Sequence, residues 1–518
     1  MSPTALFAFA AVFAAVSAAA FAGRLARVLA RGPGGTRRRD DPLPSLAGWG
    51  LADRGFGSVM TWFLLGSSIY TVYTFLAVPA LVYQVGGGGL FALPYTVIFY
   101  PMAFLVLPRL CQVARDNDLL TPADLVRARY SSPALGAAVA VCGMLATMPY
   151  VALQLLGIQA LLTVLGIPPG GPVADGALTG VFSVLAVATW RDGLRAPAAI
   201  SVVKTVLVFT ALGVLLVVVT RRLGGVPAIF DAATPVLWQR SGTAAGLPTT
   251  QAAATAYASL ALGSALALLC YPHVITGAFA AREPRVLRRN AIALPAWTLL
   301  LGLFAMLGVA ATAAGVTAPP GHGELAVPLL VDRVLPHWAT GVVLGALGIG
   351  ALVPAAVMSV SAGSTFARNV YAEFVQPTAT PATQVRVGRL VSVLFKFGAL
   401  AFALGLRPQD SINLQLLGGV WILQTGPSLL AALWVPWFHR GALLAGWAAG
   451  MVAGTALVAL GGFSSVVSLP WPAGRVAVYA ALPALAANLL VAAALTPLLA
   501  RAGVARGLNR LVARETLA

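Results

Sequence analysis

Thirteen apolar stretches, separated by short polar loops, follow one another along this chain of 518 residues. An α-helix rises about 1.5 Å per residue, so about 20 apolar residues are enough to cross the hydrocarbon core of a membrane. Most of the stretches reach that length, and each is expected to cross the membrane as a helix. A transmembrane β-barrel would instead show alternating segments of about ten residues. The stretches cover about residues 4–23, 57–85, 88–112, 133–166, 176–190, 197–220, 252–278, 291–314, 338–367, 387–406, 411–438, 441–463 and 475–499.

The composition is that of a membrane protein, and it excludes a soluble globular protein and a disordered chain. Hydrophobic residues make up 59% of the chain and charged residues 9%, and the mean hydropathy is +0.88. An average soluble domain carries about 25% charged residues, so a soluble globular enzyme is excluded. A disordered chain would be poor in apolar residues. The predicted fold class is therefore an all-α polytopic membrane protein with about 13 transmembrane helices.

The excess of basic residues, a formal net charge of +18, has a topological explanation. Positive charge is retained in the cytoplasmic loops of membrane proteins. With the N-terminus outside, 25 of the 33 Lys and Arg residues fall in cytoplasmic segments and 6 in outside segments. The remaining two are Lys204 and Lys396, the chain's lysines, and both lie inside apolar stretches. We therefore predict a multi-pass protein of the cell membrane with its C-terminus in the cytoplasm and no nucleic-acid partner.

The first apolar stretch, residues 4–23, has two interpretations, a cleaved signal peptide and a first transmembrane helix. It is rich in alanine and close to the N-terminus, as a signal peptide would be. However, it lacks a positively charged segment before it and is followed at once by Arg24, Arg27, Arg31 and Arg37–Arg39. This pattern favours a retained first helix that enters from outside and stops on arginines.

The polar segments leave no room for a separate soluble domain. The longest cover about residues 23–56, 221–251 and 315–337 and are expected to be loops with short amphipathic turns. The sequence has no P-loop or zinc-ligand pattern, which disfavours ATP-driven transport by this chain alone. It also lacks the clustered His, Asp and Glu that catalysis in a bilayer would need, so we do not expect an enzyme.

Two apolar stretches are interrupted at matching places. Residues 57–85 contain Gly66-Ser67-Ser68, and residues 252–278 contain Gly263-Ser264 followed by Tyr271-Pro272-His273. Transporters commonly bind substrate where such interruptions occur in two halves of the chain. Glycine and serine are also frequent in packed membrane helices, but the matched placement favours a binding site.

Each interrupted stretch opens a set of five predicted helices, and the two sets enter the membrane from opposite sides. This arrangement predicts two inverted repeats flanked by additional helices. The expected divisions are residues 1–56 (an extra helix and a basic cytoplasmic loop), 57–220 (first repeat), 252–438 (second repeat) and 441–518 (two helices and a basic tail).

Ionisable groups inside the predicted membrane region are few. All fifteen acidic residues lie in loops or at helix ends, so no carboxylate is expected at mid-membrane. Lys204, Lys396 and His273 are the intramembrane candidates, and such residues are functional candidates by default. The alternative for each lysine is that its ammonium reaches towards the membrane surface.

Ala356 and Ser359 are three residues apart and share a helix face. A carbonyl and a hydroxyl on that face are suited to a small cation. The alternative is a serine that bonds back to its own helix.

Several segments, taken in order, resemble the solute:sodium symporter family. The resemblance covers about residues 45–440 and, within the family, is greatest to bacterial monocarboxylate uptake permeases. It implies a five-plus-five inverted-repeat core that works by alternating access. The segments are Asp53-Arg54 through TWFLLGSSIYTVYTFLAVPALVYQVG, PRLCQVARDNDLLTPADLVRARY, MPYVALQLLGIQALL, YPHVITGAFAAREPRVLRRNA and PAAVMSVSAGSTFARNVY.

The resemblance also implies a sodium site between the first and eighth core helices. The matching ligands are the carbonyls of Ser67, Tyr70 and Ala356 and the hydroxyl of Ser359. The family's second hydroxyl falls on Val360, and its frequent acidic residue is absent at Ser68-Ile69. Lys204 lies on the fifth core helix, which approaches this site in the family fold. We therefore expect its ammonium to replace sodium, with a proton as the coupled ion, or to act as the counter-charge of a substrate carboxylate.

The expected function is secondary active uptake of a small monocarboxylate such as lactate, pyruvate, acetate or propionate. Alternatives are a symporter for proline or another amino acid, a sugar or a vitamin, and a membrane-bound sensor. Apart from Na⁺ or H⁺ no cofactor is expected, and the partners are the substrate and membrane lipid. The candidate substrate-lining residues are Ser68, Thr71, Tyr73, Tyr271 and His273.

Overall fold

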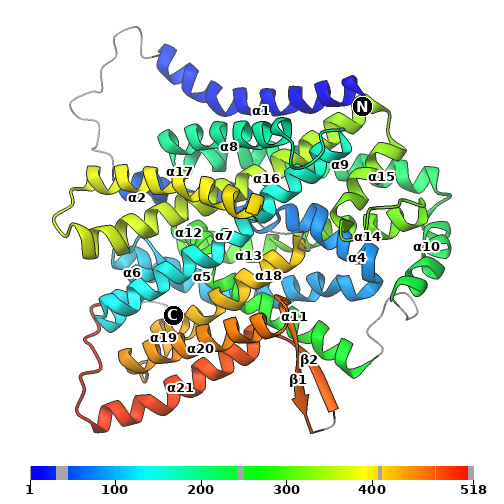
Figure 1. Ribbon diagram of the computed structural model, residues 1–518. Helices are drawn as coiled ribbons and strands as arrows, with labels where there is room; N and C mark the ends of the chain where they lie inside the picture. The colour runs from blue at the N-terminus through cyan, green and yellow to red at the C-terminus, as the bar shows by residue number, and fades with distance from the viewer. Residues whose placement is uncertain (1, 31–44, 242–249, 406–410, 473, 512–518) are drawn as a thin grey trace.

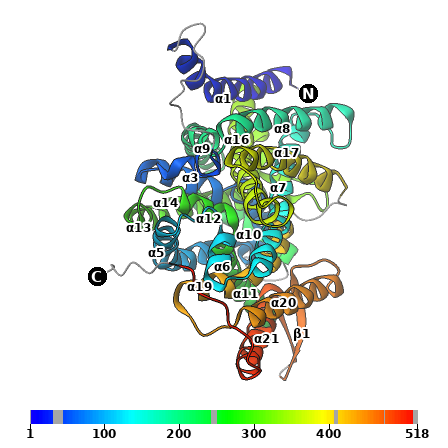
Figure 2. The ribbon, with the colours of Figure 1, turned by 90° about the vertical axis from the view of Figure 1, so that its left-hand side faces the viewer.

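The computed structural model describes residues 2–30, 45–241, 250–405, 411–472 and 474–511 (Figure 1). The helices pack side by side, and most run across Figure 1 from left to right. Helix α1 (Pro3–Ala30) lies along one edge and helix α21 (Ala481–Arg501) along the opposite edge, in both Figure 1 and Figure 2. Arg31 and Arg37–Arg39, on which the first helix was expected to stop, lie outside the described residues.

The elements between α1 and residue 222 include those of the predicted first repeat, residues 57–220. The α-helices are α2 (Leu46–Gly50), α3 (Ser58–Ile69), α4 (Val78–Val85), α5 (Ala92–Asp116), α6 (Pro122–Tyr130), α7 (Pro133–Val164), α8 (Pro172–Asp192) and α9 (Arg195–Arg222). Short helical turns of other types are η1 (Ala52–Arg54), η2 (Tyr73–Ala77) and η3 (Gly86–Phe91).

The elements of the second half continue the helical pattern. The α-helices are α10 (Val226–Ser241), α11 (Gln251–Cys270), α12 (Pro272–Phe279), α13 (Pro284–Ala293), α14 (Pro295–Ala313), α15 (Ala326–Val334), α16 (His337–Phe366), α17 (Pro381–Gly405), α18 (Ser411–Ile422), α19 (Gly426–Trp434) and α20 (Arg440–Leu460). The remaining elements are η5 (Gly323–Leu325), η6 (Ala367–Val375), η7 (Leu423–Thr425) and the strands β1 (Val466–Trp471) and β2 (Gly474–Tyr479).

The prediction of an all-α polytopic membrane protein is confirmed. Ten helical segments among the described residues are long and apolar enough to cross a membrane. Pro3–Val16 and Ser58–Ile69 are shorter apolar helices, and α17 carries Arg386, Arg389 and Lys396 within an otherwise apolar helix. The count of thirteen crossings stays a prediction.

Two segments differ from the sequence expectations. The stretch predicted over 475–499 begins with a strand, because β1 and β2 pair antiparallel from Val466↔Tyr479 to Trp471↔Gly474, and α21 starts only at Ala481. The polar interval 221–251 contains the 16-residue helix α10 rather than only loop. Both segments connect longer helices. Their structure depends on the elements that they pack against, so the local sequence pattern did not predict it.

Helix α16 is buried over nearly its whole length and contacts α1, α7, α9 and α17. Its contact with α1 requires small residues, because a Cβ added at Gly341 would lie 2.1 Å from the Ala5 carbonyl oxygen. Close backbone approach at glycine is typical of packed membrane helices. The first helix is thereby attached to the centre of the bundle.

Two helices are broken, and the breaks lie slightly later than the glycine–serine pairs. Gly66, Ser67 and Ser68 belong to α3, and the chain leaves the helix at Tyr70, whose φ and ψ are −93° and 98°. Helix α11 continues through Gly263-Ser264 to Cys270, and the chain leaves the helix at Tyr271, whose φ and ψ are −63° and 128°. In Figure 1 the first broken helix ends at α4 on the right, whereas the second begins on the right and ends at α12 nearer the left, so the two run in opposite directions.

Candidate functional site

The break after α3 exposes backbone carbonyls that have no partner in their own helix. Lys204, on α9, is fully buried, and its Nζ donates hydrogen bonds to the carbonyl oxygens of Ser67 (2.7 Å) and Tyr70 (3.0 Å). The C-terminal end of a helix is also the negative end of its dipole. The Nζ of Lys204 therefore lies where the broken helix offers oxygen ligands and negative potential.

The other neighbours of the Lys204 ammonium are weakly polar. Its Nζ lies 5.5 Å from the centre of the Phe75 ring, a distance suited to a cation–π interaction. The Ser67 hydroxyl lies 3.3 Å from the hydroxyl of Thr205, the residue that follows Lys204 on α9. Lys204 forms no ion pair with any acidic residue in the described part of the chain. The ammonium is thus held by carbonyls and an aromatic face, as a bound metal cation would be.

The two residues expected from α16 contact each other. The Ser359 hydroxyl donates to the Ala356 carbonyl at 2.9 Å, and both residues are fully buried. This is the bond back to the helix that was the alternative for Ser359. The structure therefore brings Ser67, Tyr70 and Lys204 into direct contact, whereas Ala356 and Ser359 pair within their own helix.

The second break carries a buried imidazole without hydrogen-bond partners. His273 is fully buried at the start of α12, and neither of its ring nitrogens has a partner among the described residues. The rings of Tyr150 and Tyr271 lie 5.6 and 5.3 Å from the imidazole, centre to centre. The Tyr271 hydroxyl donates to the Gln415 carbonyl at 3.3 Å. A buried polar group without a partner is costly, so this imidazole is suited to receive a ligand.

The three substrate candidates of the first break differ in what their polar atoms do. Ser68 donates to the Leu65 carbonyl at 3.0 Å, and the Thr71 hydroxyl accepts from the Tyr73 backbone N–H at 3.2 Å. The Tyr73 hydroxyl is buried and has no partner in the described structure. The hydroxyls of Ser68 and Thr71 therefore bond the backbone at the break, whereas the Tyr73 hydroxyl remains available to donate a hydrogen bond.

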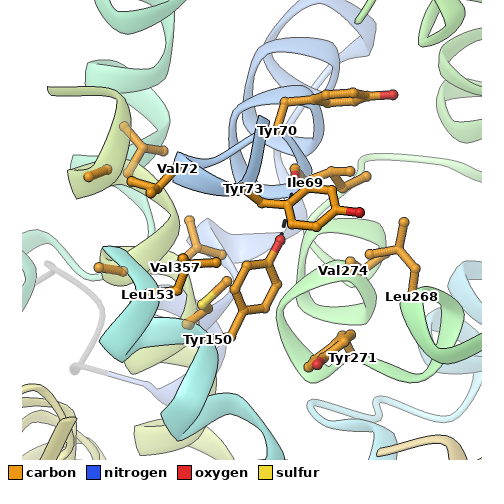
Figure 3. Packing of buried hydrophobic residues seen from close by; sticks show 14 of the residues in the cluster. Ile69, Tyr70, Val72, Tyr73, Tyr150, Leu153, Leu268, Tyr271, Val274 and Val357 are labelled. Atoms are coloured by element: carbon orange, nitrogen blue, oxygen red, sulfur yellow. Dashed lines mark hydrogen bonds between the residues drawn. The ribbon is translucent and has the colours of Figure 1, made fainter. Parts of the chain in front are cut away.

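The aromatic rings of the two breaks gather in one region. Figure 3 shows Tyr73, Tyr150 and Tyr271 near the ends of the broken helices, with Ile69 beside Tyr73 and Val274 to one side of the three rings. The three tyrosines come from η2, α7 and the junction of α11 with α12. The region is therefore lined mainly by rings and aliphatic side chains, with few polar atoms.

Two residues of α7 complete the first break and were missed by the sequence reasoning. The Gln154 side-chain oxygen accepts from the Val72 backbone N–H at 3.2 Å, and the Tyr150 hydroxyl donates to the Ile69 carbonyl at 3.3 Å. The signal available was two polar side chains one turn apart in an apolar helix of 32 residues. Together with Lys204 they satisfy the backbone of the break with side chains.

The second buried lysine has different contacts. Lys396 donates to the Thr189 hydroxyl at 3.0 Å and to the hydroxyl and carbonyl of Ser392 at 3.0 and 3.2 Å. These groups belong to α8 and to its own helix, α17, and none lies at a helix break. Its geometry is that of a buried structural donor.

Residues 51–466 match the sequence profile of the sodium:solute symporter family. The chain belongs to the sodium:solute symporter family. It is 43% identical over 421 residues to a protein of Rhizobium johnstonii named monocarboxylate transport permease protein, covering 81% of this chain and 84% of that protein. It is 31% identical to the symporter YodF of Bacillus subtilis, covering 75% and 77% of the two chains. The family membership makes this chain a membrane symporter.

The fold also matches a solved structure of a Na⁺-coupled sialic acid symporter in a substrate-bound, outward-open state. The TM-score is 0.71, with 93% of this chain and 98% of that chain covered, at 15% sequence identity. This similarity confirms the fold of the family for the present chain.

Proposed function

We propose that this symporter imports small monocarboxylates, of the lactate, pyruvate, acetate and propionate class, by alternating access. The substrate site would lie between the two helix breaks near mid-membrane. The name of the Rhizobium johnstonii relative supports this substrate class. We further propose that the N-terminus lies outside and the C-terminus in the cytoplasm, as the distribution of basic residues predicts.

The chemistry of the second break supports a carboxylate ligand. Its His273 offers two buried nitrogen atoms, and Tyr73 of the first break a buried hydroxyl, that have no partner among the described residues. The start of α12 is the positive end of a helix dipole and favours an anionic group. The surrounding rings of Tyr150 and Tyr271 suit a small acid with a short apolar chain. Hydrogen bonds to a charged ligand contribute more than those between neutral groups.

We propose that the coupling ion is a proton carried by Lys204. The contact of the Lys204 ammonium with the Ser67 and Tyr70 carbonyls is the observation that carries this proposal. Protonation supplies the positive charge that would hold the carbonyls of the break in place of sodium. Deprotonation on the cytoplasmic side would remove the charge and loosen these contacts, which links proton release to the conformation of α3.

Sodium coupling is the second candidate. The family description and the Na⁺-coupled sialic acid symporter of the same fold favour it. The carbonyls of Ser67, Tyr70 and Ala356 and the hydroxyl of Ser359 would then be the ligands, and the Lys204 ammonium would have to leave the carbonyls. Oxygen ligands at a broken helix are a common sodium site in transporters.

Uptake of labelled lactate into proteoliposomes, with competition by unlabelled solutes, tests the substrate class. We expect pyruvate, acetate and propionate to inhibit lactate uptake, and proline and glucose to leave it unchanged. Inhibition by proline alone, or uptake of glucose in place of lactate, would contradict the monocarboxylate assignment and favour another small solute.

A further inference from the structure

An apolar groove runs along the membrane-facing surface between α5, α11, α19 and α21. Its volume is about 530 Å³, and its walls include Leu105, Leu269, Leu430 and Leu489. Leu105 and Trp434 also line a second hollow, which contains Arg109 and Arg288. The two hollows therefore form one groove that is apolar along its length and basic at one end.

The two arginines at this end have no partners in the described structure. Arg109 lies on α5 and Arg288 on α13, two helices that pack side by side (Figure 2). The Arg109 Nε is buried and lacks a hydrogen-bond partner, and neither guanidinium belongs to an ion pair with a described residue. The nearest acidic residue in sequence to Arg288, Glu283, lies 3.9 Å from Arg282 instead. The basic end of the groove thus carries two uncompensated positive charges.

With the predicted topology, the groove would lie in one leaflet of the bilayer. Its basic end lies on the arginine-rich face predicted to be cytoplasmic, where Trp434 and Trp437 are half exposed. Tryptophans in such positions mark the membrane–water interface. At its other end the groove reaches Leu266 and Leu269, just before the break at Tyr271. The hydrocarbon of one leaflet is about 15 Å thick, which a single acyl chain spans.

We propose that this groove binds an anionic phospholipid of the cytoplasmic leaflet. One acyl chain would lie between α5 and α19, and the phosphate would accept hydrogen bonds from Arg109 and Arg288. Guanidinium groups bind phosphate oxygens in a bidentate manner, and basic pockets between membrane helices on this side suit anionic headgroups. The negative charge of the lipid would offset part of the charge of two arginines that no described carboxylate neutralises. The site does not depend on the substrate or the coupling ion.

Native mass spectrometry of the full-length protein, titrated with phosphatidylglycerol or phosphatidylcholine of identical acyl chains, tests the proposal. We expect phosphatidylglycerol to occupy the tightest site and Arg109→Gln/Arg288→Gln to weaken it by about tenfold or more. Arg285→Gln/Arg289→Gln, which removes two charges from the same α13 without altering the groove lining, is expected to retain the preference. Equal affinity for both lipids, or equal loss in both double variants, would overturn the proposal.

Two further variants separate lipid binding from misfolding. Arg109→Lys/Arg288→Lys keeps the charges and is expected to recover most of the selectivity for phosphatidylglycerol. Leu105→Trp leaves both arginines in place and fills the groove, so it is expected to weaken lipid binding. Full binding of phosphatidylglycerol to Leu105→Trp would contradict a lipid chain in this groove.

Discussion

The two helix breaks look alike in sequence but differ in how their polar groups are satisfied. At the first break, side chains from α7 and α9 bond the exposed backbone, and the Lys204 Nζ donates to two of the carbonyls that were predicted to bind a cation. At the second, the His273 imidazole has no partner in the described structure. The exposed backbone of the first break is bonded without a ligand, and only side-chain hydroxyls such as that of Tyr73 are left without a partner in the described structure, whereas the second break has both nitrogens of an imidazole left. This difference supports the proposal that the first break serves coupling and the second binds the substrate.

The largest effect is expected from removing the ammonium of the first break. Lys204→Gln keeps a polar side chain of similar length but cannot carry a proton, so lactate should equilibrate across the proteoliposome membrane without being accumulated. Lys396→Gln is the matched control, because that lysine is equally buried but contacts Thr189 and Ser392. Equal accumulation by the wild type and Lys204→Gln would contradict the role of Lys204.

The second break is tested by removing its unpartnered imidazole. His273→Ala is expected to raise the KM for lactate about 10- to 100-fold, since a hydrogen bond to a charged group is lost. His322→Ala, at a part-exposed histidine that bonds Glu324, serves as the control. An unchanged KM in His273→Ala, with folded protein in the membrane, would place the substrate elsewhere.

A smaller effect, on stability, is expected at the side chain that closes the first break. Gln154→Leu leaves the Val72 N–H buried without its acceptor, which costs about 1–3 kcal/mol in the free energy of unfolding. Thermal unfolding in detergent measures this loss. Gln159→Leu on the same helix, where the side chain is half-buried, is expected to change stability less. Equal melting temperatures for the two variants would show that the bond to Val72 does not stabilise the break.

The smallest effect is expected at Ser359. Its hydroxyl bonds the Ala356 carbonyl of its own helix, so Ser359→Ala should change proton-driven uptake by less than about twofold. Initial rates of lactate uptake with and without sodium provide the measurement. A strong loss of uptake that occurs only in sodium would instead identify Ser359 as a sodium ligand.

The sequence predicted the helical membrane fold because long apolar stretches have few alternatives in a bilayer. It also singled out Lys204 and the residues around both breaks, since charged or helix-breaking groups are conspicuous in an apolar chain. Which atoms meet depends on packing across distant helices. The bond from Gln154 to Val72 joins residues 82 positions apart, and no local pattern indicates it. The hairpin of β1 and β2 was not predicted from the sequence, for a related reason. The apolar segment Val476–Tyr479 is equally consistent with the start of a helix, and its pairing with β1 is not visible in the local pattern.

The central claim is that a proton on Lys204 takes the place of sodium at the first break. Uptake of labelled lactate into proteoliposomes, with inward gradients of H⁺ and Na⁺ imposed separately, tests it most directly. The account predicts accumulation driven by the proton gradient in sodium-free buffer, abolished in Lys204→Gln. Accumulation that requires the sodium gradient and is undiminished in Lys204→Gln would contradict it.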